Sequence, residues 1–173
     1  MKPYQAILFA LCFTAFAASS SLPKNNTVAG FEKIRSLIGE WDGTLPDGKP
    51  IKISYQEISG GAIVEIYHSQ DPMWWNMSSA YHRDKEKIML THFCSWGNHP
   101  RMAAVVPAGT IKRLEFDFID ITKTQPQNGY MRNVAFEFKS EDHILHHWLW
   151  QEQDKQVPLT LTLKRKKAKP ELK

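Results

Sequence analysis

Cysteine is scarce in this chain, whose 173 residues include only Cys12 and Cys94. Cys12 lies in an apolar N-terminal segment that we expect to be removed, so the mature chain is expected to contain no intramolecular disulfide. Stability must then come from a hydrophobic core, for which 42% hydrophobic and 12% aromatic residues are sufficient. The length predicts a single domain.

Long apolar runs are absent beyond the N-terminus. Residues 6–18 are almost wholly apolar, follow Lys2 and precede three serines, which is the order of a signal peptide. The run is shorter than the roughly 20 residues that a membrane-spanning helix needs. We therefore predict a signal peptide over residues 1–20, a flexible linker over 21–28, and a secreted or periplasmic protein.

The body of the chain also lacks an excess of charge of one sign. The net charge is +4, but the basic residues concentrate in the last ten positions, so the body is slightly acidic. A basic tail of this kind can contact nucleic acid or anionic lipid. Because export argues against nucleic acid, we expect a disordered, solvated tail over residues 166–173 and no nucleic-acid partner.

Helical periodicity is confined to one short segment, where Phe31, Ile34 and Leu37 share a face and Gly39 follows. After it, alternating segments are separated by turn residues. Strands are expected near residues 40–45, 50–58, 62–68, 75–83, 86–94, 101–106, 111–120, 131–139, 143–152 and 156–165. A meander of about ten strands closes most simply as a barrel, because closure removes exposed edges. The predicted fold is all-β, an antiparallel up-and-down barrel over residues 29–165 with a short N-terminal helix.

Two sets of residues resemble known proteins. Gly39, Glu40 and Trp41, which follow the short helix, resemble the G-x-W signature of the calycins, which include lipocalins, fatty-acid-binding proteins and nitrobindins. This resemblance implies that Trp41 packs at the closed end of the barrel beneath a basic residue of the last strand, Lys164 or Arg165.

The second resemblance covers most of the mature chain. Residues 91–94 (T-H-F-C) and 97–102 (G-N-H-P-R-M) are similar to the T-H-Y-C and G-N-Q-P-R-M blocks of an uncharacterised family of secreted bacterial proteins. Phe93 stands where that family has Tyr, and His99 where it has Gln. The resemblance supports the barrel and its export, and it implies no activity.

Alternation predicts which side chains face the interior. It places His92 and Cys94 on the same inner face, and it favours a barrel that binds a small, mostly apolar ligand. A fully packed interior without a pocket is the alternative. Arg101 would either clamp a ligand carboxylate or pair with Glu65 across strands. The expected ligand-binding residues are His92, Cys94, Arg101, Glu65, Tyr81, Phe116, Phe136 and Trp148.

Haem, a metal ion and catalysis are the competing hypotheses. Nitrobindin-like barrels hold haem through a histidine on a late strand, so the resemblance makes His146 the candidate axial ligand. His92 and Cys94 could share a metal ion, but their spacing matches no standard zinc pattern, and we assign no metal ligands. A Cys94 nucleophile with His92 as base is awkward, because side chains at i and i+2 on a strand lie roughly 6–7 Å apart. The residues therefore favour a binding protein over an enzyme.

Trp74 and Trp75 follow Pro72 and Met73 at a predicted turn between strands. Such a pair either forms an exposed aromatic patch or folds back to plug the core. An exposed patch, together with the basic tail, would support weak peripheral contact with a membrane.

Overall fold

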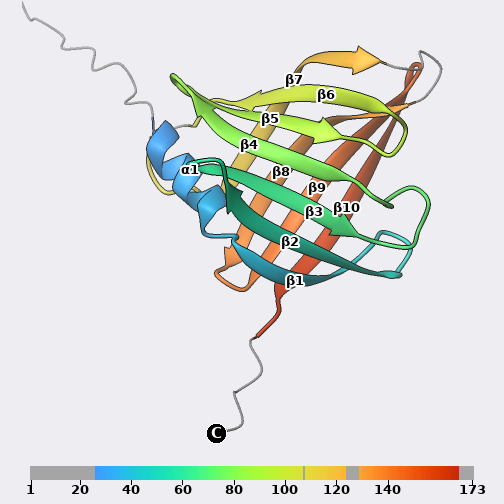
Figure 1. The fold of residues 1–173 in the computed structure, drawn as a ribbon, viewed down its shortest axis with the longest axis horizontal. Coiled ribbons are helices and arrows are strands. Elements are labelled where there is room, and N and C mark those ends of the chain that lie inside the picture. Colours follow the sequence, from blue (N-terminus) through green and yellow to red (C-terminus); the bar gives the residue numbers. More distant parts are fainter. Residues whose placement is uncertain (1–25, 107, 124–128, 168–173) are drawn as a thin grey trace, which may run out of the picture.

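The computed structural model describes residues 26–106, 108–123 and 129–167, which form one short helix and ten strands (Figure 1). The predicted signal peptide and most of the predicted linker and tail lie outside these residues. The elements are α1 (Thr27–Arg35), β1 (Gly39–Thr44), β2 (Pro50–Ile58), β3 (Ala62–His68), β4 (Ser78–Asp84), β5 (Lys87–Phe93), β6 (Asn98–Ala104), β7 (Arg113–Lys123), β8 (Tyr130–Ser140), β9 (His143–Glu152) and β10 (Lys155–Arg165).

The ten strands form a closed antiparallel barrel in which each strand pairs with its neighbours in sequence. The one exception is β1, which pairs with β10 and closes the wall, with Trp41 opposite Arg165. Gly60 and Gly61 form the turn between β2 and β3, where both have positive φ angles that other residues adopt at a cost. The predicted all-β barrel with a short N-terminal helix is confirmed.

Some predicted boundaries are wrong. The predicted sixth strand begins at residue 101, whereas β6 begins at Asn98. A tight turn explains the difference, because Gly97 N–H donates to the Cys94 carbonyl and Cys94 N–H donates to the Asn98 carbonyl. Asn98 and His99 are therefore strand residues. Helix α1 begins at Thr27, inside the predicted linker.

Helix α1 covers one end of the barrel (Figure 1). Phe31 and Ile34 are buried on its inner face. At the same end, the Trp41 indole N–H donates to the Leu37 carbonyl at 2.8 Å. The Arg165 guanidinium lies 4.3 Å from the centre of the Trp41 ring. The expected basic partner of Trp41 is thus Arg165, and this end of the barrel is closed.

The C-terminal ends of β1, β3, β5, β7 and β9 lie at the opposite end, which we call the loop end. Trp74 is buried there and stacks on Tyr67 with ring centres 6.1 Å apart, while Trp75 is 60% exposed. The tryptophan pair is therefore split between a core plug and the surface. Weak membrane contact through Trp75 stays a prediction. In the part of the chain that the structure describes, no helix is long and apolar enough to cross a membrane.

Candidate ligand-binding site in the barrel interior

One acidic and two basic side chains are completely buried inside the barrel: Glu65 on β3, His92 on β5 and His146 on β9. Each occupies an inward position of an alternating strand, as the burial patterns of β3, β5 and β9 show. Most of the other inward side chains are apolar. Burying ionisable groups in an apolar interior costs free energy unless they are paired. Their partners therefore define the site.

Glu65 is held by two tyrosines from the flanking strands. Tyr55 on β2 donates its hydroxyl proton to Oε1, and Tyr81 on β4 donates to Oε2, both at 2.6 Å. The register explains this arrangement, because Tyr55 lies directly opposite Glu65 and Tyr81 lies diagonally across from it. Burial raises the pKa of Glu65, and the hydrogen bonds from the two tyrosines partly offset that rise.

His146 completes this cluster. Its Nε2 lies 2.9 Å from the Tyr55 hydroxyl, and its Nδ1 lies 3.4 Å from Glu65 Oε1. The only hydroxyl proton of Tyr55 is used in the hydrogen bond to Glu65. The Tyr55 oxygen must therefore accept a hydrogen bond from the Nε2–H of His146. In a neutral His146, Nδ1 then directs a lone pair at a carboxylate oxygen. A proton on Glu65 removes this repulsion, so the raised pKa of Glu65 and the geometry both favour a cluster without net charge.

A second polar layer lies next to this cluster, nearer the loop end. It contains Tyr67, Ser79, His92 and Trp148. On each of their strands, these residues occupy the next inward position toward the loop end from the layer of Glu65. Ser79 Oγ lies 3.0 Å from His92 Nδ1, and the His92 ring centre lies 4.9 Å from that of Trp148. Burial lowers the pKa of His92 from its ordinary value of 6.5 to about 3, so the ring is neutral near pH 7.

Three buried polar atoms of this layer have no hydrogen-bond partner among the described residues: Tyr67 Oη, His92 Nε2 and Trp148 Nε1. Burial raises the pKa of Tyr67 most, and the charge of Glu65 raises it further. The indole of Trp148 and the hydroxyl of Ser79 lower it. The ring centre of Tyr67 lies 6.2 Å from that of His92, in an edge-on arrangement. Buried polar atoms in proteins are normally hydrogen-bonded. Three unpartnered atoms in one layer mark a position for a polar group from outside the chain.

The structure brings most of the predicted site residues together in the interior. The buried members are Glu65, Tyr81, His92, Cys94, Phe116, Phe136, His146 and Trp148. Sequence analysis missed Tyr55, Tyr67 and Ser79. Alternation along β2 and β3 would have placed the two tyrosines inside, but only the register between strands shows that they surround Glu65.

Arg101 is the predicted site residue that does not reach the interior. Its side chain is 52% exposed and forms an ion pair with Asp120 on β7. Alternation in β6 points Met102 inward and Arg101 outward. The pairing of β6 with β7 skips Ile119, and this bulge turns Asp120 outward beside Arg101. Arg101 therefore neither pairs with Glu65 nor provides a clamp inside the barrel.

The structure does not support a reactive Cys94. The side chain is 6% exposed, and burial raises the pKa of its thiol, so the thiol stays protonated near pH 7. The Nδ1 atom of His92 faces Ser79. The pairing needed for a cysteine nucleophile with a histidine base is therefore not formed.

The residues around His146 do not fit haem. An axial histidine needs a ring nitrogen that is free to bind iron. Nε2 of His146 faces Tyr55, Nδ1 faces Glu65, and the ring of Phe136 packs with its centre 4.4 Å away. An iron on either nitrogen would displace part of the Glu65 cluster. Among the described residues there is also no group of three His, Cys, Asp or Glu side chains placed to hold a metal ion.

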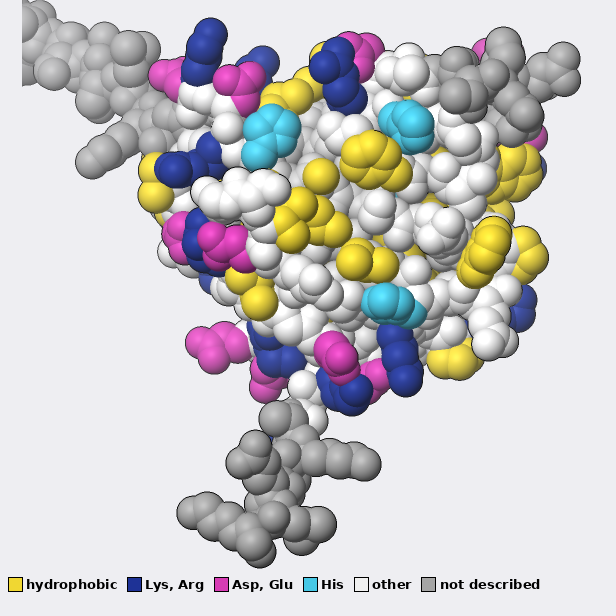
Figure 2. All heavy atoms as spheres, in the orientation of Figure 1, with side chains coloured by type: hydrophobic (Ala, Val, Ile, Leu, Met, Phe, Trp, Pro, Cys, Tyr) yellow, Lys and Arg dark blue, Asp and Glu magenta, His cyan; other side chains and the backbone are white. Residues whose placement is uncertain are grey.

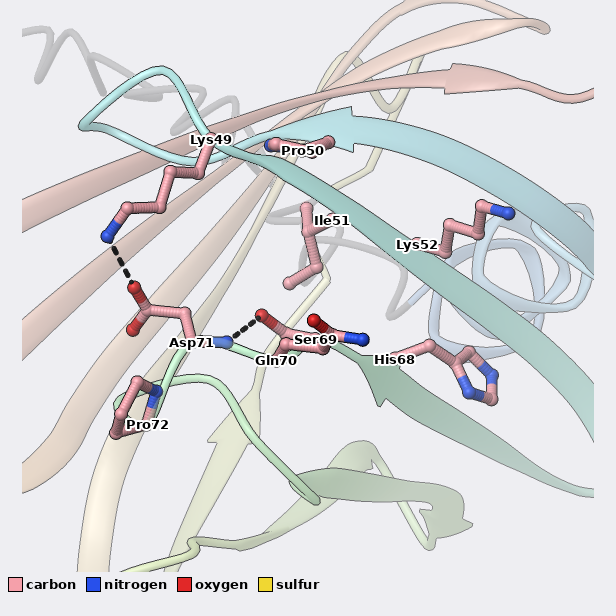
Figure 3. Close-up of a pocket in the computed structure, with 9 residues that line it drawn as sticks. All are labelled: Lys49, Pro50, Ile51, Lys52, His68, Ser69, Gln70, Asp71 and Pro72. Atoms are coloured by element: carbon pink, nitrogen blue, oxygen red, sulfur yellow. Dashed lines mark hydrogen bonds and ion pairs between the residues drawn. The ribbon is translucent and has the colours of Figure 1, made fainter.

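A surface pocket of about 480 Å³ lies between the start of β2 and the segment that follows β3 (Figure 3). Several of its polar groups bind one another: Lys49 binds Asp71 at 2.8 Å, and the Asp71 N–H donates to the Ser69 hydroxyl at 3.1 Å. Figure 2 shows that hydrophobic side chains gather at the centre of the face formed by β2 to β5, with charged ones mostly toward its edges. The unpartnered groups of the interior make it the better candidate site.

Comparison with known proteins supports the fold and no family assignment. No protein-family model and no curated protein matches the chain. Among solved structures, the crystal structure of Rv2717c from M. tuberculosis is similar, with a TM-score of 0.57 and 10% identity over 82% of this chain and 100% of that one. A redesigned β-barrel, mFAP1 bound to DFHBI, gives a TM-score of 0.32 and 18% identity over 76% and 96% of the two chains. The similarity to Rv2717c supports the fold alone, a closed antiparallel β-barrel.

Proposed function

We propose that this protein is an exported barrel that binds a small, mostly apolar molecule in its interior. The observation that carries the proposal is the set of unpartnered atoms on Tyr67, His92 and Trp148, which come from three strands and meet in one buried layer. A ligand atom placed among them would satisfy these groups. The surrounding side chains are mainly aromatic and aliphatic, which suits an apolar ligand body.

The cost of the polar interior supports a functional role. Replacing buried ionisable groups by well-packed apolar residues is often neutral or stabilising. A barrel that served only as a rigid scaffold would gain nothing from two buried histidines and a buried glutamate. Departures from an apolar core are expected where a site is needed.

The position of the layer suggests the direction of entry. Tyr67, His92 and Trp148 lie nearer the loop end than the Glu65 cluster does, because β3 and β5 run toward that end and β9 runs toward its turn with β10. The other end is covered by α1 and closed by Trp41 and Arg165. We expect the ligand to enter from the loop end.

Binding of Nile red, an uncharged apolar dye with oxygen acceptors, tests the proposal. We expect saturable binding with a blue shift in its emission. Tyr67→Phe and Trp148→Phe should each weaken binding about fivefold, since each removes one hydrogen bond worth about 1 kcal/mol. Tyr130→Phe removes a hydroxyl from a half-buried position of β8 and is the matched control, which should bind as the wild type does. The proposal fails if the dye does not bind saturably and native mass spectrometry of protein from its own host shows no carried molecule.

A further inference from the structure

We infer that the ligand's polar group is an uncharged oxygen acceptor, such as an alcohol, aldehyde, ketone or ester, and not a carboxylate or an amine. The inference rests on the proposed function and names the ligand class of the same site. It follows from the charges that the interior contains and from the hydrogen-bonding capacity of the three unpartnered atoms.

A carboxylate would find no cation inside the barrel among the described side chains. Among the side chains that the structure describes, every lysine and arginine is exposed or half-exposed. Arg101, the predicted clamp, lies on the outer face with Asp120. Burial also keeps His92 neutral. A ligand carboxylate beside Tyr67 would therefore be buried next to Glu65 without a compensating charge, which is strongly unfavourable.

An amine would find the acidic group already occupied. Both oxygens of Glu65 accept hydroxyl protons from tyrosines at 2.6 Å. His146 Nδ1 lies on a further side of the same carboxyl group, at 3.4 Å. To pair with Glu65, an ammonium group would have to displace a tyrosine and remove the proton that the cluster favours. The cluster is thus complete without a ligand cation.

The unpartnered atoms fit an oxygen acceptor. The indole Nε1–H of Trp148 can only donate, so the ligand atom facing it must accept. The Tyr67 hydroxyl and His92 Nε2 can each donate or accept, the latter according to how Ser79 shares a proton with Nδ1. An ester or carbonyl oxygen satisfies the donors, and a ligand hydroxyl can also donate to one of the other two atoms.

Competition by matched twelve-carbon probes against Nile red tests the inference at neutral pH. We expect 1-dodecanol and methyl dodecanoate to displace the dye, and dodecanoic acid and dodecylamine to bind at least about tenfold more weakly. The acid should gain affinity relative to the alcohol as the pH is lowered and the acid becomes neutral.

Glu65→Gln provides a second test, because the amide keeps the shape of the side chain and removes its acidic group. Because Glu65 is uncharged in this cluster, we expect the variant to keep the wild type's preference for dodecanol over dodecanoic acid. Equal binding of acid and alcohol by the wild type or by Glu65→Gln, or Nile red binding that neither alcohol nor ester displaces, would overturn the inference and leave the proposed function standing. Failure of Nile red itself to bind would count against the proposed function.

Discussion

The residues that define the interior act in pairs whose members come from different strands. Glu65 depends on Tyr55 and Tyr81 for its hydrogen bonds, and His92 depends on Ser79. Alternation within single strands was enough to predict that Glu65 and His92 face inward. The pairs themselves could not be predicted, because they depend on register, which short turns and side-chain packing set together.

The two buried histidines predict a loss of stability in acid. Burial lowers the pKa of His92 and of His146 from 6.5 to about 3. The unfolded chain therefore takes up protons below about pH 6.5 that the folded chain does not, so this stabilising contribution is full above pH 6.5 and is lost as the pH falls toward 3. Each histidine should contribute about 1.4 kcal/mol per pH unit to the slope. The raised pKa of Glu65 acts in the opposite sense, since its stabilising contribution is lost as the pH rises.

Comparison of the wild type with His92→Gln isolates one of these histidines. The free energy of unfolding should be measured with urea between about pH 6.5 and about pH 4.5. Its dependence on pH should be less steep in the variant, by the equivalent of about one proton. Above pH 7 the two stability curves should run parallel, because His92 is then neutral in both states. Equal slopes in the acidic range would show that His92 takes up its proton in the folded protein as readily as in the unfolded chain.

At the level of elements, the strands were easier to predict than their irregularities. Period-two alternation identified ten strands because apolar and polar residues exchange faces at every step. The only sign of the bulge at Ile119 in the sequence is that two apolar residues, Phe118 and Ile119, stand side by side, and one such pair does not predict a bulge. It nevertheless decides where Asp120 points and, through it, what Arg101 binds.

Docking of α1 on the barrel leads to a prediction for Gly30. Alanine has a higher helix propensity than glycine by about 1 kcal/mol. However, a Cβ atom at this position would lie 2.5 Å from Val106 Cγ2 and 3.1 Å from Ile88 Cδ1. We expect Gly30→Ala to lower the free energy of unfolding by about 1–3 kcal/mol, because overpacking outweighs propensity.

Urea or thermal unfolding measures this effect. Val106→Ala removes the atoms that the new Cβ would meet. In a Val106→Ala background, Gly30→Ala should therefore lower the free energy of unfolding by less than it does in the wild type, as expected for coupled neighbours. A single Gly30→Ala variant more stable than the wild type would show that the helix is not packed tightly against this wall.

For the whole molecule, composition and strand number predicted a closed barrel correctly. Closure depends on the contact between β1 and β10, and the G-x-W resemblance pointed to its main residues. Trp41 packs against Arg165, whose guanidinium donates to the carbonyls of Ile38 at 3.0 Å and Ser36 at 2.7 Å. The choice between Lys164 and Arg165 required the register, which sends Lys164 outward.

Arg165→Lys should therefore destabilise the whole barrel. An ammonium group cannot reproduce the planar, multiple hydrogen bonding of a guanidinium or its stacking on an indole. We expect the free energy of unfolding to fall by about 1–3 kcal/mol. Lys164→Arg, the reverse change at the exposed neighbouring position, should alter it by less than about 0.5 kcal/mol. Similar small effects of both substitutions would contradict a closing role for Arg165.

The strand order also bears on how the chain is made. Nine of the ten strand pairings join neighbours in sequence, so they can form as soon as each hairpin has been synthesised. The tenth joins the earliest strand to the latest. Until β10 emerges, β1 keeps an unpaired edge that can add a strand from another chain. A nascent barrel of this kind is thus open to intermolecular pairing until β10 has been synthesised.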